Sequence, residues 1–423
     1  MAATPVDTRT RHLSIDAVRG FAVLGILLMN IVGMGLPSFA YLNPAYAGGS
    51  TGADLWTWAV NNVLTDGKMR ALFTMLFGAS TVLIATRAEG GRPGPVQTHY
   101  SRMFWLFVIG MLHAYFLWWG DILVCYALAG LFIFPFRKIG VGVQAGVGAA
   151  ILIALLGYHL YETRIIDVIY VRAHLPGATP AAVKAWADIR LLLDPPAAMA
   201  AQQVAGFGGS FMDALKARAT VSQILQTTLL PTDEIPEAIG QMFIGMALFR
   251  SGFFTLGWSN RAYGWAMAIG YLVAAPITAV LAWMIWKSGF EPMTLHRLEV
   301  WQAAARPFVG LAHGALVLVI VRAGIWRGLV DRFAAAGRMA FSNYLMTSVI
   351  TTVLFCGFGF GLYGKLSRFE QLYVVAGVWA FILIWSKPWL ERFHYGPFEW
   401  VWRSLVKMSP QPFMKPRPRP AVA

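Results

Sequence analysis

Two arginine-containing pairs share a spacing that could support chemistry inside an apolar helix. Arg19 is followed eleven residues later by Asn30, and Arg102 is followed eleven residues later by His113. Eleven residues make about three helical turns, so each pair should share one helix face at a separation of about 16 Å. Nearly all the residues between the partners are apolar. Ionisable groups in such surroundings are costly, and they indicate a functional path.

His113 is the candidate proton acceptor. Asp121 follows it by eight residues, in the segment Trp118-Trp-Gly-Asp121, which we expect to turn between two helices. A histidine can act as a general base near neutral pH, and a carboxylate can fix its tautomer. The simpler alternative is a histidine that is satisfied in the core. The presence of Arg102, Asp121 and Asn30 nearby favours the catalytic interpretation.

Further polar residues interrupt other apolar runs. Asp16 lies three residues before Arg19 and can neutralise it, either as part of a site or as a structural ion pair. The remaining candidates are Lys68 before one apolar run, Arg338 and Asn343 at the start of another, and Arg403 in an amphipathic segment. Lys68 could also be a simple interfacial anchor.

Composition defines the class of protein. Residues are 57% hydrophobic and only 13% charged, with a mean hydropathy of +0.58, against about 25% charged residues in a soluble protein. The first apolar run, from Leu13 past Leu28, is too long for a signal-peptide core, so we interpret it as a retained span. Cys125 and Cys356 lie in apolar runs and form no metal-binding spacing, and we assign no metal.

The predicted fold is an all-α, polytopic membrane helix bundle of about ten transmembrane helices. Each is an apolar run that could cross about 30 Å of hydrocarbon. The runs are 13–35, 68–86, 100–119, 121–136, 139–160, 236–253, 262–286, 306–326, 338–360 and 370–390. We expect an N-terminal bundle over 1–160, an amphipathic cap or connector over 161–235, a C-terminal bundle over 236–409, and a disordered basic, proline-rich tail over 410–423.

The net charge of +14 is explained by topology and needs no nucleic-acid partner. With the N-terminus inside, most Lys and Arg residues fall at cytoplasmic helix ends, as the positive-inside rule requires. We therefore expect a bacterial cytoplasmic (inner) membrane protein with both termini in the cytoplasm. Residues 161–235 would then be extracytoplasmic, either as a connector or as a substrate-binding lid.

Several of these segments resemble the YeiB family of bacterial membrane proteins, whose C-terminal half is a domain of unknown function. The resemblance covers nearly the whole chain. It is carried by Ser14-Ile-Asp-Ala-Val-Arg19-Gly20, Asn30, Leu76-Phe-Gly78, His113, Gly120-Asp121-Ile-Leu123, Gly337-Arg-Met-Ala340, Asn343-Tyr344 and Gly396-Pro-Phe-Glu-Trp400.

More distantly, the Asp16-x-x-Arg19-Gly20 opening is similar to that of the transmembrane acyltransferase superfamily. This group includes heparan-α-glucosaminide N-acetyltransferase and bacterial O-acyltransferases of surface sugars. The resemblance implies an acyl-CoA co-substrate that enters from the cytoplasm and an acceptor hydroxyl or amine on the far side. In the O-acyltransferases a catalytic histidine stands where this chain has Asn30, so here the base would be His113.

For an acyltransferase, Arg19, Arg102 and Arg338, with Arg403 as a further option, would hold the nucleotide phosphates. His113 would take the acceptor proton, Asp121 would orient it, and Asn30 or Asn343 could donate to the oxyanion. Two alternatives remain: a proton-coupled small-molecule transporter that uses the same polar residues, and a membrane scaffold. The expected partners are membrane lipid, acyl-CoA and an extracytoplasmic acceptor, with a homodimer as an option.

Overall fold

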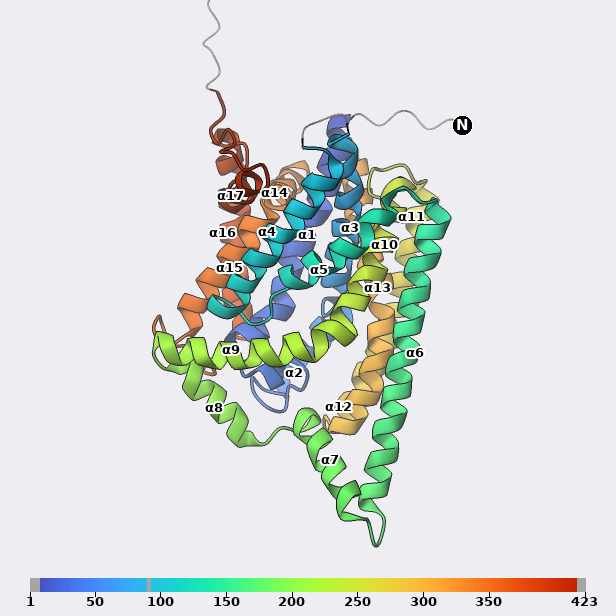
Figure 1. The fold of residues 1–423 in the computed structure, drawn as a ribbon, viewed down its shortest axis with the longest axis vertical. Coiled ribbons are helices and arrows are strands. Elements are labelled where there is room, and N and C mark those ends of the chain that lie inside the picture. Colours follow the sequence, from blue (N-terminus) through green and yellow to red (C-terminus); the bar gives the residue numbers. More distant parts are fainter. Residues whose placement is uncertain (1–7, 90–92, 417–423) are drawn as a thin grey trace, which may run out of the picture.

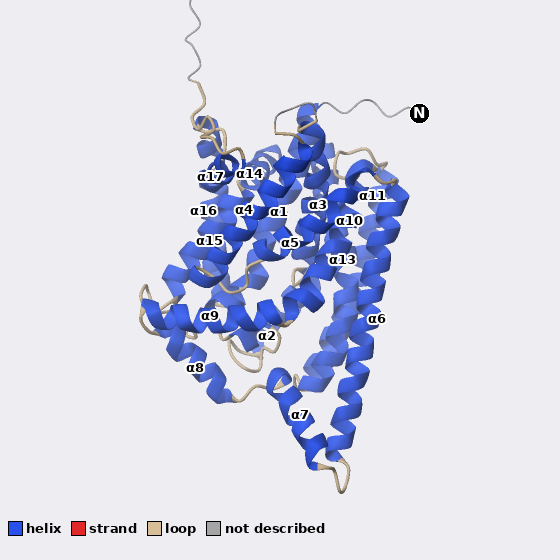
Figure 2. Cartoon of the chain, in the orientation of Figure 1, coloured by secondary structure: helices blue, strands red, loops and turns tan. Residues whose placement is uncertain are grey.

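The computed structural model describes residues 8–89 and 93–416, and this part of the chain is built from helices (Figures 1 and 2). One isolated β-bridge, between Phe393 and Met414, is its only extended pairing. The predicted all-α class is therefore confirmed.

Most helices follow one another through short connections, and the longer ones are residues 36–51 and 356–370. In the first half they are α1 (Thr8–Gly35), α2 (Gly52–Leu64), α3 (Lys68–Arg87), α4 (Pro95–Phe116), α5 (Leu123–Ile133), α6 (Val141–His174), α7 (Pro180–Leu193), α8 (Ala197–Gly208) and α9 (Phe211–Thr227). In the second half they are α10 (Ile235–Arg250), α11 (Asn260–Ala268), α12 (Ala275–Lys287), α13 (Pro292–Ala323), α14 (Arg327–Arg338), α15 (Ala340–Phe355), α16 (Gln371–Arg392) and α17 (Pro397–Val406). Two short 3-10 helices are η1 (Ser38–Tyr41) and η2 (Phe134–Lys138). Two short π-helices are η3 (Leu230–Glu234) and η4 (Ile269–Ala274).

Six helical segments in the described residues are long and apolar enough to cross a membrane. They are Leu13–Gly35, Gly52–Thr86, Val141–His174, Asn260–Lys287, Pro292–Ala323 and Gln371–Arg392. The expected span 121–136 corresponds to α5, with 11 residues and about 16 Å of rise, which continues directly into the short helical turn Phe134–Lys138. The count of about ten spans stays a prediction.

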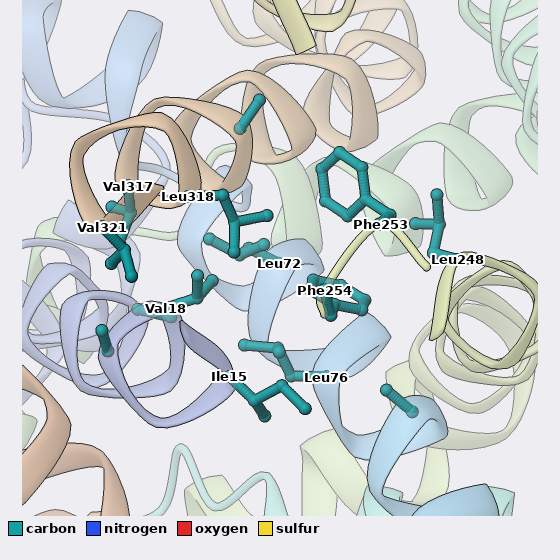
Figure 3. Close-up of a cluster of buried hydrophobic side chains, with 14 of the residues drawn as sticks. Ile15, Val18, Leu72, Leu76, Leu248, Phe253, Phe254, Val317, Leu318 and Val321 are labelled. Carbon is teal, nitrogen blue, oxygen red and sulfur yellow. The ribbon is translucent and has the colours of Figure 1, made fainter. Parts of the chain in front are cut away.

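The two halves of the chain interleave in the bundle. The most extensive helix contacts join α1 to α14, α3 to α10 and α6 to α10. A shared core lies between α1, α3, α10 and α13, where Ile15, Leu72, Leu248, Phe254 and Leu318 pack together (Figure 3). The N-terminal and C-terminal halves therefore bury their apolar faces against each other.

The segment 161–235 does not begin as a separate unit. Helix α6 runs without a break to His174, beyond the predicted end of its span at residue 160, and α7, α8 and α9 follow. Helix α9 crosses the bundle, while α7 and the distal part of α6 lie at the end opposite to the first and last described residues (Figure 1). The buried residues of α9, Ala214, Arg218, Val221 and Ser222, recur at the spacing of one helix face.

The beginning of the tail is ordered, contrary to the prediction for 410–423. The backbone N–H of His394 donates to the carbonyl of Phe413, and that of Lys415 donates to the carbonyl of Arg392. The ring of Phe413 packs against Trp400 with centroids 5.1 Å apart. A single aromatic residue in a polar segment thus has enough apolar surface to dock it. Residues 417–423 lie outside the described part of the chain.

Two glycines allow α1 and α14 to touch backbone to backbone. A Cβ atom placed on Gly20 would lie 1.9 Å from the carbonyl oxygen of Phe333, and one on Gly337 would lie 1.9 Å from that of Asp16. Small residues permit this close helix approach in membrane bundles. The Arg19-Gly20 and Gly337-Arg338 segments are therefore held against each other.

We predict that Gly337→Ala destabilises the fold by about 1–3 kcal/mol, because the added methyl group must push α14 away from α1. The control is Gly328→Ala on the same helix, where no atom lies within 4 Å of the added carbon. Thermal unfolding in detergent should show a lower midpoint for the first variant only. Equal midpoints for both variants would contradict this close packing.

Candidate active site

Helix α4 carries both Arg102 and His113. The turn that follows α4 places the carboxylate of Asp121 next to the His113 ring. The helix begins at Pro95 and ends at Phe116, and the chain then reverses into α5. Asp121 lies in this turn and accepts a hydrogen bond of 2.8 Å from the backbone N–H of Val124 in the first turn of α5. A Cβ atom on Gly110 would lie 3.0 Å from the Asp121 carboxylate, so this glycine gives the turn its space.

His113 joins a carboxylate to a hydroxyl. Its Nδ1 lies 2.7 Å from Oδ2 of Asp121, and its Nε2 lies 2.8 Å from Oγ of Ser348 on α15. The His113 residue is 2% exposed and Ser348 is 0% exposed. The expected proximity of His113 and Asp121 is confirmed, and the contact with Ser348 adds a third member.

The partners of His113 define its tautomer. If the Asp121 carboxylate is ionised, it can only accept hydrogen bonds, and Nδ1 then carries the proton that points to it. In the neutral form of that tautomer Nε2 has a lone pair that can accept the hydroxyl hydrogen of Ser348. The hydrogen bonds therefore link the Asp121 carboxylate to the His113 imidazole and the imidazole to the Ser348 hydroxyl. In this arrangement a histidine can remove a proton from oxygen.

The two asparagines do not join this group. Asn30 is half-buried on α1, and within the described residues its side chain makes no hydrogen bond. The Asn343 amide donates to the carbonyl of Ala336 at 3.0 Å and to Ser386 at 3.2 Å, which uses both of its hydrogens. Asn343 therefore ties α15 to α14 and α16, and the expected donor role is not available to it in this arrangement.

Three arginines from separate helices converge near the other end of α4. The guanidinium of Arg102 stacks on the Trp402 ring at 4.0 Å and has no acidic or hydrogen-bonding partner among the described residues. The two charges that act most strongly on it are those of Arg403 and Arg19. Arg19 is paired with Asp16 at 2.9 Å and also donates to Ser80. This arginine cluster carries more positive than negative charge.

Glu399 fixes the helix that brings Arg403 and Trp402 to this place. It is buried, and its carboxylate accepts hydrogen bonds from the backbone N–H groups of Phe341 and Ser342 and from the Ser342 hydroxyl. Burial raises the pKa of Glu399, and these hydrogen bonds oppose the rise. The start of α15 is thus capped by α17, which places Trp402 against α4.

The remaining predicted residues, Arg338 and Lys68, are not bonded to these groups in the described residues. Arg338 is exposed at the end of α14. Lys68 is buried at the start of α3, where its ammonium donates to the carbonyl of Asn62. The ion pair of Arg306 with Glu299 lies beside Lys68 and acts on its charge. Neither residue contacts the His113 group or the arginine cluster through a hydrogen bond or ion pair in the described residues.

Sequence reasoning missed Ser348. It lies 235 positions from His113, so no local spacing connects them. The available signal was the run of hydroxyl groups on the apolar helix α15, at Thr347, Ser348, Thr351 and Thr352. Such groups often bond only to their own helix, as Thr347 does to the carbonyl of Asn343.

Comparisons with known proteins give relatives of unestablished function. A family model described as "Protein of unknown function (DUF418)" matches residues 248–409. The chain is 32% identical to "Uncharacterized protein YeiB" of Escherichia coli (strain K12), over 95% of this chain and 98% of that protein. It is 27% identical to "Uncharacterized protein YxaH" of Bacillus subtilis (strain 168), over 97% and 98% of the two chains. No solved structure matches.

We predict that Asp121 and His113 are energetically coupled, because the buried hydrogen bond joins a charged group to its partner. A double-mutant cycle of Asp121→Asn and His113→Gln should give a coupling free energy of about 1.5–3 kcal/mol in detergent unfolding. His313 is a matched control, since it bonds to Tyr271 and to the carbonyl of Leu64 elsewhere. Coupling of Asp121 to His313→Gln should be near zero, and equal coupling in both cycles would refute the assigned contact.

Proposed function

The chain belongs to the YeiB family, and on this premise we propose that it is an integral membrane acyltransferase that takes its acyl group from acyl-CoA. One observation carries the proposal. Helix α4 has an arginine without an acidic partner at one level and, about 16 Å further along, a histidine oriented to accept a proton from oxygen. These are the two requirements of a donor that has phosphates at one end and a thioester at the other.

The arginine cluster would hold the phosphate groups of the donor. Arginine binds phosphate oxygens through two parallel N–H donors, and a partly buried guanidinium without a carboxylate has these donors free. Arg102 meets this condition, while Arg403 and Arg19 add positive charge beside it. Phosphates cannot enter the apolar middle of the bundle cheaply, so they should remain at this level. The thin pantetheine arm would then extend along α4.

His113 would supply base catalysis where the thioester ends. Its Nε2 accepts a hydrogen bond from a hydroxyl, which is the geometry needed to remove a proton from an attacking oxygen. Asp121 would hold the reactive tautomer and stabilise the imidazolium that forms. The acceptor would be a hydroxyl or amine compound that reaches this level from the side of α9.

The orientation of the chain forms part of the proposal. The first and last described residues leave the bundle at one end, and the end with α7 is opposite (Figure 1). With the arginine-rich helix ends in the cytoplasm, both termini are cytoplasmic in a bacterial inner membrane and α7 to α9 are extracytoplasmic. Acyl-CoA, a cytoplasmic metabolite, would then meet the arginine cluster first.

A second network of charges favours the alternative, a proton-coupled transporter. Arg70 pairs with Glu237 at 2.8 Å and with Glu234 at 3.5 Å, while His159 contacts Asp233 at 3.1 Å. Chains of carboxylates and histidines can relay protons in transporters. In this network, however, each basic group already has an acidic partner, whereas Arg102 has none among the described residues. A free cation indicates an anionic ligand more directly.

We predict that purified protein binds acetyl-CoA and that Arg102→Gln weakens this binding about tenfold or more, because a charge-assisted hydrogen bond to phosphate is worth about 1.5–3 kcal/mol. Calorimetry measures the change. Arg327→Gln is the control, since Arg327 is exposed and donates to its neighbouring backbone. Acetyl-pantetheine, which lacks the phosphates, should bind both variants equally.

The result that would exclude the acyltransferase is specific. If folded wild-type protein binds no acyl-CoA of any chain length and catalyses proton-coupled solute uptake in proteoliposomes, the transporter is correct. If Arg102→Gln weakens the binding of acetyl-pantetheine as much as the binding of acetyl-CoA, Arg102 does not bind the phosphate groups.

A separate prediction concerns His113. The variant His113→Ala should keep acetyl-CoA affinity within about twofold and lose most thioester turnover, about a hundredfold or more, because a positioned base contributes about 10²–10⁴. Turnover is measured as the release of free CoA thiol, which a thiol reagent detects. His313→Ala is the control, and comparable losses in the two variants would remove the special role of His113.

The orientation predicts opposite accessibility at two positions. In a chain with Cys125 and Cys356 replaced by alanine, a cysteine at position 188 should react with a membrane-impermeant reagent in intact cells, and a cysteine at position 415 should react only after lysis. Position 188 is in α7, which lies at the end of the bundle opposite to the last described residues, and position 415 is among those last described residues (Figure 1). The reverse pattern would overturn the orientation.

A further inference from the structure

We propose that Ser348 is the nucleophile of the reaction and carries the acyl group as an ester between two half-reactions. This inference rests on the proposed function and specifies its mechanism: a double displacement through an acyl-serine. Direct transfer from the thioester to the acceptor is the alternative. Three independent features of the described residues support Ser348.

The first feature is the geometry at the hydroxyl. The Ser348 oxygen lies 2.8 Å from Nε2 of His113, and its other hydrogen-bonding contact is 3.4 Å from the carbonyl of Tyr344. A serine that only satisfied its own helix would have its short bond to that carbonyl, as Thr347 does at 2.8 Å. Ser348 instead directs its short bond to the base. Proton removal by Nε2 would activate this oxygen.

The second feature is a hydrogen-bond donor with nothing to bind. The indole nitrogen of Trp118 is buried and has no hydrogen-bond partner in the described part of the chain, and the Trp118 ring lies edge-on to His113 at 6.4 Å between centroids. An unpaired buried N–H costs free energy unless a ligand completes it. The charge that develops on a thioester or ester oxygen during attack is such a ligand, and fixed donors stabilise it.

The third feature is a small cavity beside this group. It lies between α1, the α4–α5 turn, α8, α9 and α15 and has room for about one water molecule. Its lining includes Trp118, Thr351 and Thr352 but not His113 or Ser348. The two threonines follow Ser348 by about one helical turn. Trp118 and these two threonines therefore border one small cavity on the side of α9, close to the His113–Ser348 pair.

The chemistry balances without further reactants. In the first half-reaction Oγ of Ser348 attacks the thioester carbon, its proton passes to Nε2 of His113, and the C–S bond breaks. The CoA thiolate leaves with that proton as free thiol, and acyl-Ser348 remains. In the second, an acceptor hydroxyl or amine attacks the ester carbon, its proton passes through His113, and the C–Oγ bond breaks to restore the serine hydroxyl.

The test needs no acceptor. A double displacement lets radiolabelled CoA exchange into acetyl-CoA through the acyl-enzyme, and direct transfer does not. Full-length wild-type protein in detergent should catalyse this exchange and should gain one acetyl group on the peptide that contains residue 348. Ser348→Ala should lower exchange about a hundredfold or more and abolish the label. Ser348→Cys should restore a label, now as a thioester that neutral hydroxylamine removes.

Matched controls separate this proposal from the one on which it rests. Thr347→Ala removes the neighbouring hydroxyl, which bonds only to its own helix, and should keep exchange within about twofold. Acetyl-CoA affinity, measured for every variant, reports the proposed function itself. If the wild-type protein does not bind acetyl-CoA, both proposals are wrong. Normal binding without exchange or label, or exchange that persists in Ser348→Ala, would defeat the acyl-serine alone.

Discussion

A charged or polar side chain inside this bundle is stable only where another polar group lies against it, because the apolar surroundings cannot solvate it. Most interior charges obey this rule within the chain itself. Arg19 has Asp16, Arg70 has Glu237 and Glu234, and the Glu399 carboxylate has two backbone N–H groups and a hydroxyl. Several groups in the described residues depart from it, and two of them, Arg102 and the Trp118 indole nitrogen, lie at the two ends of the candidate site. The functional proposals follow from these two departures.

The candidate site depends on both halves of the chain. Arg102, His113 and Asp121 precede the segment matched by the family model, residues 248–409, whereas Ser348 and Arg403 lie within it. Neither half holds a complete set. The close contact of Gly20 with α14 and the stacking of Arg102 on Trp402 bring the halves together at the level of the arginine cluster. The C-terminal domain is therefore best understood as one side of a composite site.

Short-range features were predictable from the sequence, and long-range contacts were not. Asp121 follows His113 by only eight residues, so the sequence suggested that the two side chains could meet. Helical class also followed from composition. The partner of Nε2 could not be found this way, because Ser348 reaches it through tertiary packing. Asn343 illustrates the opposite error: its polarity suggested catalysis, but helix–helix hydrogen bonds use both amide hydrogens.

The most direct test of the account is an experimental structure of the full chain with a non-hydrolysable thioether analogue of acetyl-CoA. The account predicts phosphate density within hydrogen-bonding distance of Arg102 and an arm that follows α4, with the acyl carbonyl beside Ser348 and the Trp118 indole. Density for the nucleotide at the charged network around Arg70 would contradict it. So would an acyl chain that points into lipid, away from His113.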